Sequence, residues 1–332
     1  MTRSNFFVNK LAENKAVLAP MAGYSDAAFR LLCNRFGSAW SVTEMVSAKA
    51  ILNGNYQGIE IAEPHSTERD FVIQIYGADA DLMAEAAEIL IERYNPVAID
   101  INMGCPVKKI VAKGMGSSLL QDPPKAAKIV STLSNRLNKA ISVKMRLGYD
   151  TVNAAEVAQR LEDAGATLIA IHGRTAKQKY SGKADWKEIA KIGRILKIPV
   201  VGSGDISTKQ EYDKYRSMGL GVMIARASLG KPWIFAQLRG KPIPSPKEQI
   251  NIIFEHAVLH CAWYKNIGLS EKAAMEKFRS KLLYYLPTLK DKSFLVNIKS
   301  LDDLQSFLEK QSELKLNKAA IPTEKMKRKT LE

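Results

Sequence analysis

Short, almost purely apolar segments recur along the whole chain, and stretches with helical spacing separate most of them. The apolar segments are residues 17–19, 41–43, 71–76, 97–101, 141–147, 167–172, 198–202 and 222–225. Helical spacing is clearest at residues 80–94, 124–137 and 153–164. Strands that alternate with helices and are apolar on both faces belong to a parallel sheet that helices cover on both sides.

The number of apolar segments favours a closed sheet over an open one. Eight strands, each followed by a helix, predict a (β/α)8 TIM barrel, which we assign to residues 1–240. The alternative is an open, doubly wound sheet of the Rossmann type. It is disfavoured because no Gly-x-Gly-x-x-Gly motif follows the first strand. A barrel takes about 250 residues, so a chain of 332 residues has room for a second, smaller domain.

The composition changes at residues 241–246, where the segment KPIPSP places three prolines close together. Closely spaced prolines break regular structure, so this segment is predicted to be a linker. Helical patterns follow at residues 247–265, 270–285 and 301–313. They predict a small all-helical domain over residues 247–315. The polar, basic residues 316–332 are predicted to form a flexible tail.

The charge of the chain favours a polyanionic partner. The net charge is +15 and the isoelectric point is about 9.5, a balance that attracts phosphates. Residues 241–332 contain 17 Lys and Arg against 11 Asp and Glu, which gives +6. No apolar run approaches the ~20 residues that a bilayer requires, and the first residues do not resemble a signal peptide. Cys33, Cys105 and Cys261 lie far apart, which predicts neither a metal site nor a disulfide. We therefore expect a cytoplasmic monomer.

In a TIM barrel the reacting groups lie at the carboxyl ends of the strands. The informative residues at these ends are Pro20, Met21, Gln74, Asn102, Cys105, Lys144, His172, Ser203, Gly204, Ala225 and Arg226. The last two strand ends commonly bind a phosphate in this fold. Gly202 and Gly204 would let the backbone approach such an anion, and Arg226 could pair with it. The same residues are also compatible with two tight turns and a surface arginine. His172 could likewise be a ligand or a core histidine.

These segments resemble the tRNA-dihydrouridine synthase family, and within it most closely the bacterial B-type enzymes. The resemblance rests on the segments APMAGYSDAAFR (19–30), TEMVSAKA (43–50), DINMGCPVKK (100–109), GSSLL (116–120), VKMRLG (143–148), IHGRTAKQKYSGKADW (171–186) and GVMIARASLGKPW (221–233). Together they extend over the whole predicted barrel.

The resemblance implies an FMN-dependent enzyme that uses NADPH, or NADH, to reduce the C5–C6 bond of uridines in the D-loop of tRNA. Hydride would pass from flavin N5 to C6, and Cys105 would donate a proton to C5. The residues implied to line the flavin are Pro20, Met21, Gln74, Lys144, His172, Ser203, Gly204, Ala225 and Arg226. Lys144 would be a catalytic residue against the pyrimidine end of the ring. Asn102, Arg174, Arg279 and Lys281 would contact the substrate. No metal is implied.

The sequence departs from the family pattern at three places. The family usually has GNGDI where this chain has Gly-Ser-Gly-Asp-Ile at 202–206, and Gly-Arg where it has Ala225-Arg226. A basic RKHLAWY-like stretch is RSKLLYY at 279–285. Flavin contacts made by backbone groups at the first two places should survive these changes, whereas a contact made by the asparagine side chain would weaken. At the third place the expected histidine is missing, which bears on how RNA docks.

Two other functions fit parts of the same pattern. One is a flavin barrel that reduces a small molecule, as dihydroorotate dehydrogenases do. The basic helical extension after residue 240 argues against it, because a small substrate needs no such domain. The other is a tRNA-folding factor without catalysis, against which the presence of Cys105 and Lys144 argues.

Overall fold

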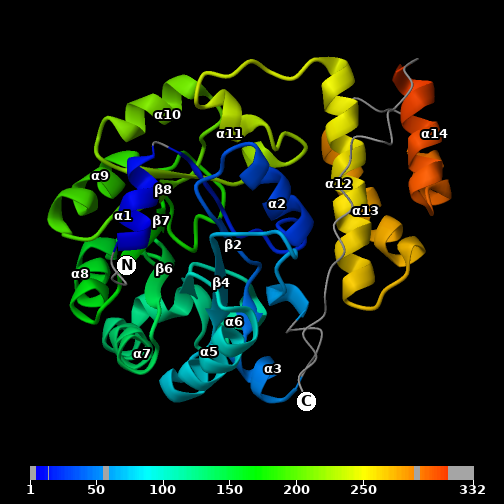
Figure 1. Ribbon diagram of the computed structural model, residues 1–332. Coiled ribbons are helices and arrows are strands. Elements are labelled where there is room, and N and C mark those ends of the chain that lie inside the picture. Colours follow the sequence, from blue (N-terminus) through cyan, green and yellow to red (C-terminus); the bar gives the residue numbers. More distant parts are fainter. Residues whose placement is uncertain (1–4, 14, 55–59, 288–291, 313–332) are drawn as a thin grey trace.

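The sheet of the protein closes on itself into a parallel barrel (Figure 1). The computed structural model describes residues 5–13, 15–54, 60–287 and 292–312. Around the barrel the strands are β1 (Val17–Leu18), β2 (Ser41–Val42), β4 (Phe71–Tyr76), β5 (Ala98–Met103), β6 (Ala140–Arg146), β7 (Leu168–His172), β8 (Val200–Ser203) and β9 (Gly221–Ile224). Neighbouring strands are parallel, and β9 pairs with β1 to complete the ring. The predicted (β/α)8 barrel is therefore confirmed.

The second barrel position is divided between two very short strands. After β2 the chain leaves the ladder and returns as β3 (Val46–Ser47), which pairs with the end of β4. Between β2 and β3 the chain stays attached to β4 through Thr43, because its Oγ1 accepts a hydrogen bond from Gln74 N at 3.0 Å. The sequence predicted only the first of these strands.

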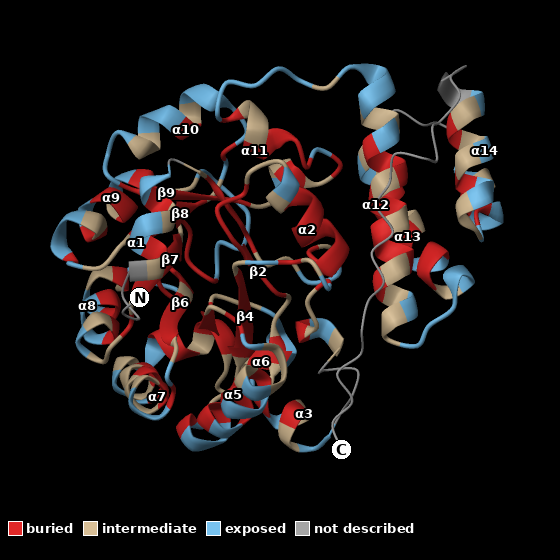
Figure 2. Cartoon of the chain, in the orientation of Figure 1, coloured by how far each residue is buried: buried red, intermediate tan, exposed pale blue. Residues whose placement is uncertain are grey.

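Helices surround the barrel, and their buried faces pack on the strands (Figure 2). The main ones are α2 (Ala27–Arg35), α3 (Ala48–Leu52), α5 (Ala80–Tyr94), α7 (Pro123–Arg136), α8 (Ala154–Asp163), α9 (Trp186–Ile195) and α10 (Lys209–Arg216). Shorter segments are α6 (Lys108–Val111), η1 (Gly116–Gln121), η2 (Arg226–Ser228) and α11 (Ile234–Gln237). Several helices begin where a side chain caps the first turn: Asp79, Asp122 and Asp185 each accept a backbone N–H of the helix that follows.

Helix α1 (Asn5–Ala12) covers the end of the barrel at which the strands begin. Its Phe7 is fully buried and packs against Trp40, with 5.2 Å between the ring centroids. Leu11 lies in the same apolar cluster, which includes Val17 and Met223 inside the barrel. The amino-terminal end of the barrel is thus filled with apolar side chains, so only the opposite end is free to form a site.

Four further helical segments follow the proline-rich segment, whose residues 241–245 form neither helix nor strand. They are α12 (Pro246–Asn266), α13 (Glu271–Tyr285), η3 (Ser293–Asn297) and α14 (Leu301–Ser312). They enclose a core of their own, in which Phe254, Met275, Phe278 and Leu308 are buried. The predicted helical region is confirmed, and the predicted tail at 316–332 lies outside the described residues. None of the helices in the described part of the chain is long and apolar enough to span a bilayer.

The carboxyl-terminal helices dock firmly on the barrel. Ile252 and Leu259 of α12 share an apolar cluster with Leu31 and Leu32 of α2. Beside this cluster, Lys281 Nζ lies 3.0 Å from Asp26 Oδ2. Burial raises the pKa of Asp26, but Lys281 together with His260 and His256 outweighs burial and holds that pKa well below its ordinary value. The proline-rich segment therefore does not separate two parts that lack contact, because the helices that follow it pack against the barrel.

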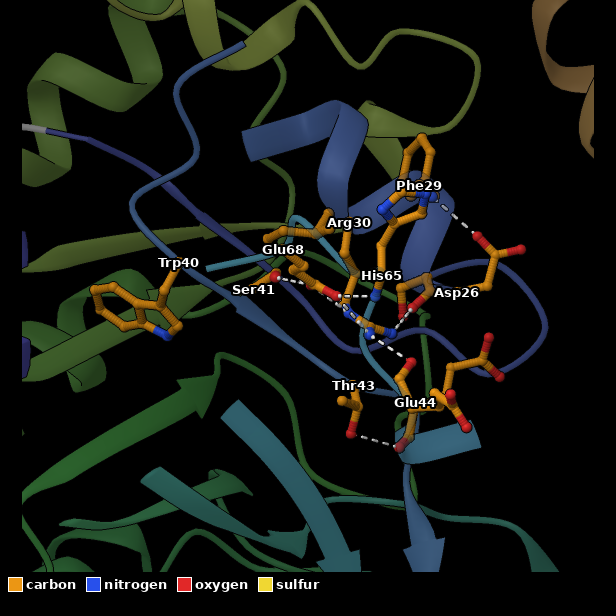
Figure 3. A network of polar contacts seen from close by, with 12 residues as sticks. Asp26, Phe29, Arg30, Trp40, Ser41, Thr43, Glu44, His65 and Glu68 are labelled. Atoms are coloured by element: carbon orange, nitrogen blue, oxygen red, sulfur yellow. Dashed lines mark hydrogen bonds and ion pairs between the residues drawn. The ribbon is translucent and has the colours of Figure 1, made fainter. Parts of the chain in front are cut away.

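A buried ion pair joins the segments at which the barrel closes (Figure 3). Arg30 of α2 is 0% exposed, and its Nε and Nη2 donate to the two carboxylate oxygens of Glu68 at 2.8 and 2.9 Å. Glu68 also accepts from Ser41 Oγ of β2 at 3.0 Å. Arg30 Nη1 donates to Ser25 O at 3.0 Å. The pair thus connects the loop after β1, strand β2 and the segment before β4.

Replacing Glu68 with Gln should lower the free energy of unfolding by about 3–5 kcal/mol, because Arg30 would keep a buried charge without a counter-ion. Urea denaturation measures this change. The matched control is Glu156→Gln, since Glu156 pairs with Arg160 at 3.0 Å on the surface, where the side chains are 59% and 51% exposed. It should cost less than about 1 kcal/mol. Equal losses in the two variants would contradict the central role of the buried pair.

Candidate active site

A large cavity opens at the carboxyl ends of the strands and has a volume of about 1000 Å³. All the residues that the sequence places against a flavin line it: Pro20, Met21, Gln74, Lys144, His172, Ser203, Gly204, Ala225 and Arg226. Asn102 and Cys105 line it as well. The barrel therefore gathers the ends of seven strands around one space, as expected for the catalytic face of this fold.

Cys105 lies on a loop that hydrogen bonds hold at both ends. Asn102 Oδ1 accepts from Gly104 N at 3.2 Å and from Cys105 N at 3.0 Å. The carbonyl oxygen of Cys105 accepts from Ser117 N at 3.0 Å. A side chain at Gly116 would bring its Cβ to 2.8 Å from that same oxygen, so the loop requires glycine there. The thiol is consequently fixed at the wall of the cavity.

The orientation of Asn102 depends on a chain of buried polar side chains below it. Asn102 Nδ2 donates to Gln74 Oε1 at 2.8 Å, and Gln74 Nε2 donates to Asp100 Oδ2 at 2.7 Å. Ser142 Oγ donates to the other carboxylate oxygen of Asp100 at 2.6 Å. Burial raises the pKa of Asp100 to about 6. At neutral pH its carboxylate is therefore mostly ionised and accepts both bonds.

Lys144 supplies a cation at the cavity wall. Burial lowers the pKa of Lys144 to about 8, and the guanidinium of Arg146 on the same strand acts in the same direction. The ammonium is therefore mostly charged at pH 7 and becomes neutral as the pH rises through about 8. Near an electron-rich ligand, such a group can stabilise negative charge or release a proton close to physiological pH.

His172 is neutral in this environment. Burial and then the positive charge of Lys144 lower the pKa of His172 to about 3. Arg174 Nη1 lies 3.3 Å from His172 Nε2. Because a guanidinium can only donate, Nε2 is the accepting nitrogen and Nδ1 carries the proton. His172 can thus offer one N–H to a ligand.

The other end of the cavity carries the exposed cation expected of an anion site. The side chain of Arg226 is 59% exposed, pairs with Asp205 Oδ1 at 3.3 Å and lies over the ring of Tyr180 at 4.9 Å. Gly204 has φ +129°, and a Cβ there would lie 2.6 Å from Ala184 Cβ and 3.2 Å from His172 Cδ2, so the position requires glycine. Gly202 has a different role from the one expected, because a Cβ there would lie 2.2 Å from the ring of Trp186. It serves the packing of a helix on the strand.

Three of the residues predicted to contact substrate do not line the cavity. Arg174 is 2% exposed, and its guanidinium bonds Asp205 and the carbonyl oxygens of Ser181 and Gly182. Arg279 donates to the carbonyl oxygens of Val296 and Ile298, which ties α13 to η3. The Nζ of Lys281 bonds Asp26 and two backbone carbonyls of the loop after β1. Their contact with substrate stays a prediction.

The cavity also contains residues to which the sequence analysis gave no role. Arg146 is two residues after Lys144 on one strand, and strand periodicity could have indicated that both face the same side. It donates to Gly104 O, Thr175 O and Lys179 O, and so joins the loops after β5 and β7. Tyr180 and Tyr284 reach the cavity from a long loop and from α13. No local pattern indicates such long-range placements. Within the described ranges, no group of three or more metal-ligating side chains could hold a metal ion.

The sequence is similar to those of known dihydrouridine synthases. The family model for dihydrouridine synthase (Dus) matches residues 17–321. A probable tRNA-dihydrouridine synthase of Rhizobium leguminosarum bv. phaseoli is 35% identical over 277 residues, covering 82% of this chain and 85% of the relative. The tRNA-dihydrouridine synthase B of Pseudomonas putida is 34% identical over 310 residues, covering 88% and 89%.

Among solved structures, the complex of 2-naphthoyl-CoA reductase with 2-naphthoyl-CoA is similar with a TM-score of 0.50. It is 10% identical, and the match covers 68% of this chain and 50% of that one, so it supports the fold alone. The family assignment rests instead on the family model, which extends over the barrel and the helices that follow it. On this evidence the chain belongs to the dihydrouridine synthase family.

Proposed function

We propose that this protein reduces uridines in tRNA to dihydrouridine, with FMN as its prosthetic group and NADPH as the source of electrons. The observation that carries the proposal is the position of Cys105. Its loop is fixed by Asn102, and it shares one cavity with Lys144. A thiol held at the wall of a large cavity, next to a cation, suits proton transfer to a planar substrate.

The residues of the cavity fit FMN. A volume of about 1000 Å³ is at the upper end of the range for small-molecule and cofactor sites, and leaves room for a base beside the prosthetic group. Arg226 offers an exposed guanidinium for the phosphate, and the adjoining loop contributes Ser203 and Gly204. Lys144 and the Nδ1–H of neutral His172 would hold the polar edge of the ring system. NADPH, or NADH, would reduce it.

When bound, FMN would supply from N5 the hydride that reaches C6 of uracil. Cys105 would donate the proton that C5 requires. Asn102 holds the Cys105 loop, so it contributes to catalysis by orientation, and its place in the wall also suits a contact with the base. The ammonium of Lys144 would stabilise negative charge that accumulates in the cavity. A uridine must leave its stack to enter such a site, which costs a few kcal/mol.

The helical region would provide part of the surface for tRNA. Arg279 and Lys281 form hydrogen bonds within the protein, so we assign the contacts with phosphate to the exposed Lys272 and Lys277 of α13. Lysines on one exposed helix contribute to affinity mainly through release of counter-ions. Tyr284 of α13 also lines the cavity, which places the helical region beside the entrance.

Cys105→Ala should keep bound flavin but lose about 10²–10⁴-fold in the rate of dihydrouridine formation, because a general acid contributes a factor of that size. The measurement is mass spectrometry of nucleosides from tRNA, taken from a deletion strain and incubated with FMN-loaded enzyme and NADPH. Cys261→Ala is the matched control, since Cys261 is buried in the helical core. Dihydrouridine formation at the wild-type rate in Cys105→Ala would refute the assigned role.

Arg226→Ala should weaken FMN binding by roughly 10–100-fold, as expected for one charge-assisted hydrogen-bonding group. Titration of the apoprotein with FMN, followed by flavin fluorescence, gives the dissociation constant. Ser203→Ala should have a smaller effect, and Arg160→Ala controls for the loss of an exposed arginine far from the cavity. Unchanged affinity in Arg226→Ala would mean that the phosphate lies elsewhere.

The double variant Lys272→Gln/Lys277→Gln should bind tRNA more weakly and reduce the dependence of log K on log salt by roughly 2, one for each lost phosphate contact. Filter binding over a series of salt concentrations measures both. Lys187→Gln/Lys191→Gln is the matched control, because these exposed lysines lie on α9, on the opposite side of the barrel (Figure 1). The same salt dependence in both double variants would exclude α13 as the RNA-binding surface.

A further inference from the structure

The last turn of α13 is seated between two loops that form the cavity. On one side is the loop after β1, which contributes Pro20, Met21, Ala22 and Tyr24 to the cavity wall. On the other side is the segment after β9, which contributes Ala225, Arg226, Ala227 and Leu229. The carboxyl-terminal helices therefore reach the wall of the proposed FMN site itself.

Lys281 makes the contact with the loop after β1. It is 7% exposed, and its ammonium lies 3.0 Å from Asp26 Oδ2, 3.1 Å from Tyr24 O and 3.5 Å from Gly23 O. An ammonium has three N–H donors, and three acceptors surround this one. Met21 is part of the same tight turn, since its carbonyl oxygen accepts from Tyr24 N at 2.9 Å. Movement of Tyr24 would therefore displace Met21.

Gly230 makes the contact with the segment after β9. A Cβ built on Gly230 would lie 2.1 Å from the carbonyl oxygen of Tyr284, a distance that no side chain can occupy. The helix backbone thus rests directly on this glycine. Hydrogen bonds hold the turn on both sides of Gly230: Lys231 N donates to Ser228 O, and Leu229 N donates to Arg226 O. A shift at Gly230 would therefore reach Arg226.

The two contacts form one tightly closed junction. Tyr284 OH donates to Tyr24 OH at 3.0 Å, and the two rings meet edge to face at 5.3 Å. The void left between α13 and the two loops is only about 10 Å³. A junction packed to this extent transmits displacement, because close-packed side chains leave no room to absorb it.

We propose that the last turn of α13 is a positioning element of the catalytic cavity, in which Lys281 and the seat at Gly230 hold the loops after β1 and β9 at the separation that FMN binding requires. The inference rests on the proposed function, because it takes FMN as the occupant. Lys281 is then a positioning residue, and the helical region has a second role beside contact with RNA.

The first test compares Gly230→Ala with Gly219→Ala. Both glycines have positive φ, +68° and +80°, so alanine causes similar backbone strain at either position. A Cβ at Gly219 meets nothing within 4 Å, whereas at Gly230 it must displace α13. Apoprotein of each variant is titrated with FMN. Gly230→Ala should bind FMN roughly tenfold more weakly, the effect of one lost contact in a site, while Gly219→Ala should stay within about twofold of wild type.

The second test separates positioning from stability. In Asp26→Asn/Lys281→Met both buried charges are removed, so no orphaned ion destabilises the fold. Asn also retains the cap that Asp26 Oδ1 provides for Phe29 N at the start of α2. Compared with wild type, the double variant should melt at a similar temperature yet bind FMN several-fold more weakly, because the carbonyls of Gly23 and Tyr24 lose their donor.

The results show whether the inference or the proposed function has failed. Wild-type protein that does not bind FMN would refute the proposed function. Wild-type protein that binds FMN, together with a folded Gly230→Ala whose affinity equals that of Gly219→Ala, would overturn the inference. If Gly230→Ala does not fold, the double variant decides: unchanged affinity relative to wild type overturns the inference, and weakened affinity at an unchanged melting temperature supports it.

Discussion

The entrance of the barrel depends on Arg30, whose guanidinium has no access to solvent. Arg30 can remain charged inside the protein only because Glu68 neutralises it through two hydrogen bonds. Other hydrogen bonds of the pair hold Ser25 in the loop after β1 and Ser41 in β2. The pair thus fixes the end of the first cavity loop, where α2 begins. Asp26, the next residue of that loop, then orients both α2 and Lys281.

Much of the fold could be predicted from the sequence because it depends on local periodicity. Strands that are buried on both faces are apolar without interruption, and the predicted segments differ from the observed strands only at their ends. The helix at Ala80–Tyr94 matches the prediction because an aspartate caps it and its apolar residues repeat regularly. Strand β3 and helix α1 were not predicted. Their positions depend on contacts between distant segments, because β3 pairs with β4 and α1 packs against residues of β1 and β9.

The candidate site was predictable only in part, for a physical reason. Residues at strand ends, such as Lys144 and His172, can be assigned to the cavity because the fold alone brings strand ends together. Tyr180 and Tyr284 reach it through loop conformation and helix docking, which depend on contacts between distant segments. Lys281 is the clearest case. Its sequence environment is that of a surface lysine on a basic helix, yet its ammonium is buried against a carboxylate of the barrel.

The cap at the other end of the barrel has a consequence for synthesis of the protein. Phe7 and Leu11 of α1 are buried only together with residues such as Val201 and Met223, and Gly221 lacks a side chain where Leu11 approaches it. A ribosome must therefore add more than two hundred residues before this helix finds its full set of partners. At ordinary rates of translation, about 10–40 s pass between synthesis of this helix and synthesis of the residues that bury its apolar face. During that interval the apolar side chains of this segment stay exposed on the nascent chain, and exposed apolar surface of this kind is what chaperones bind.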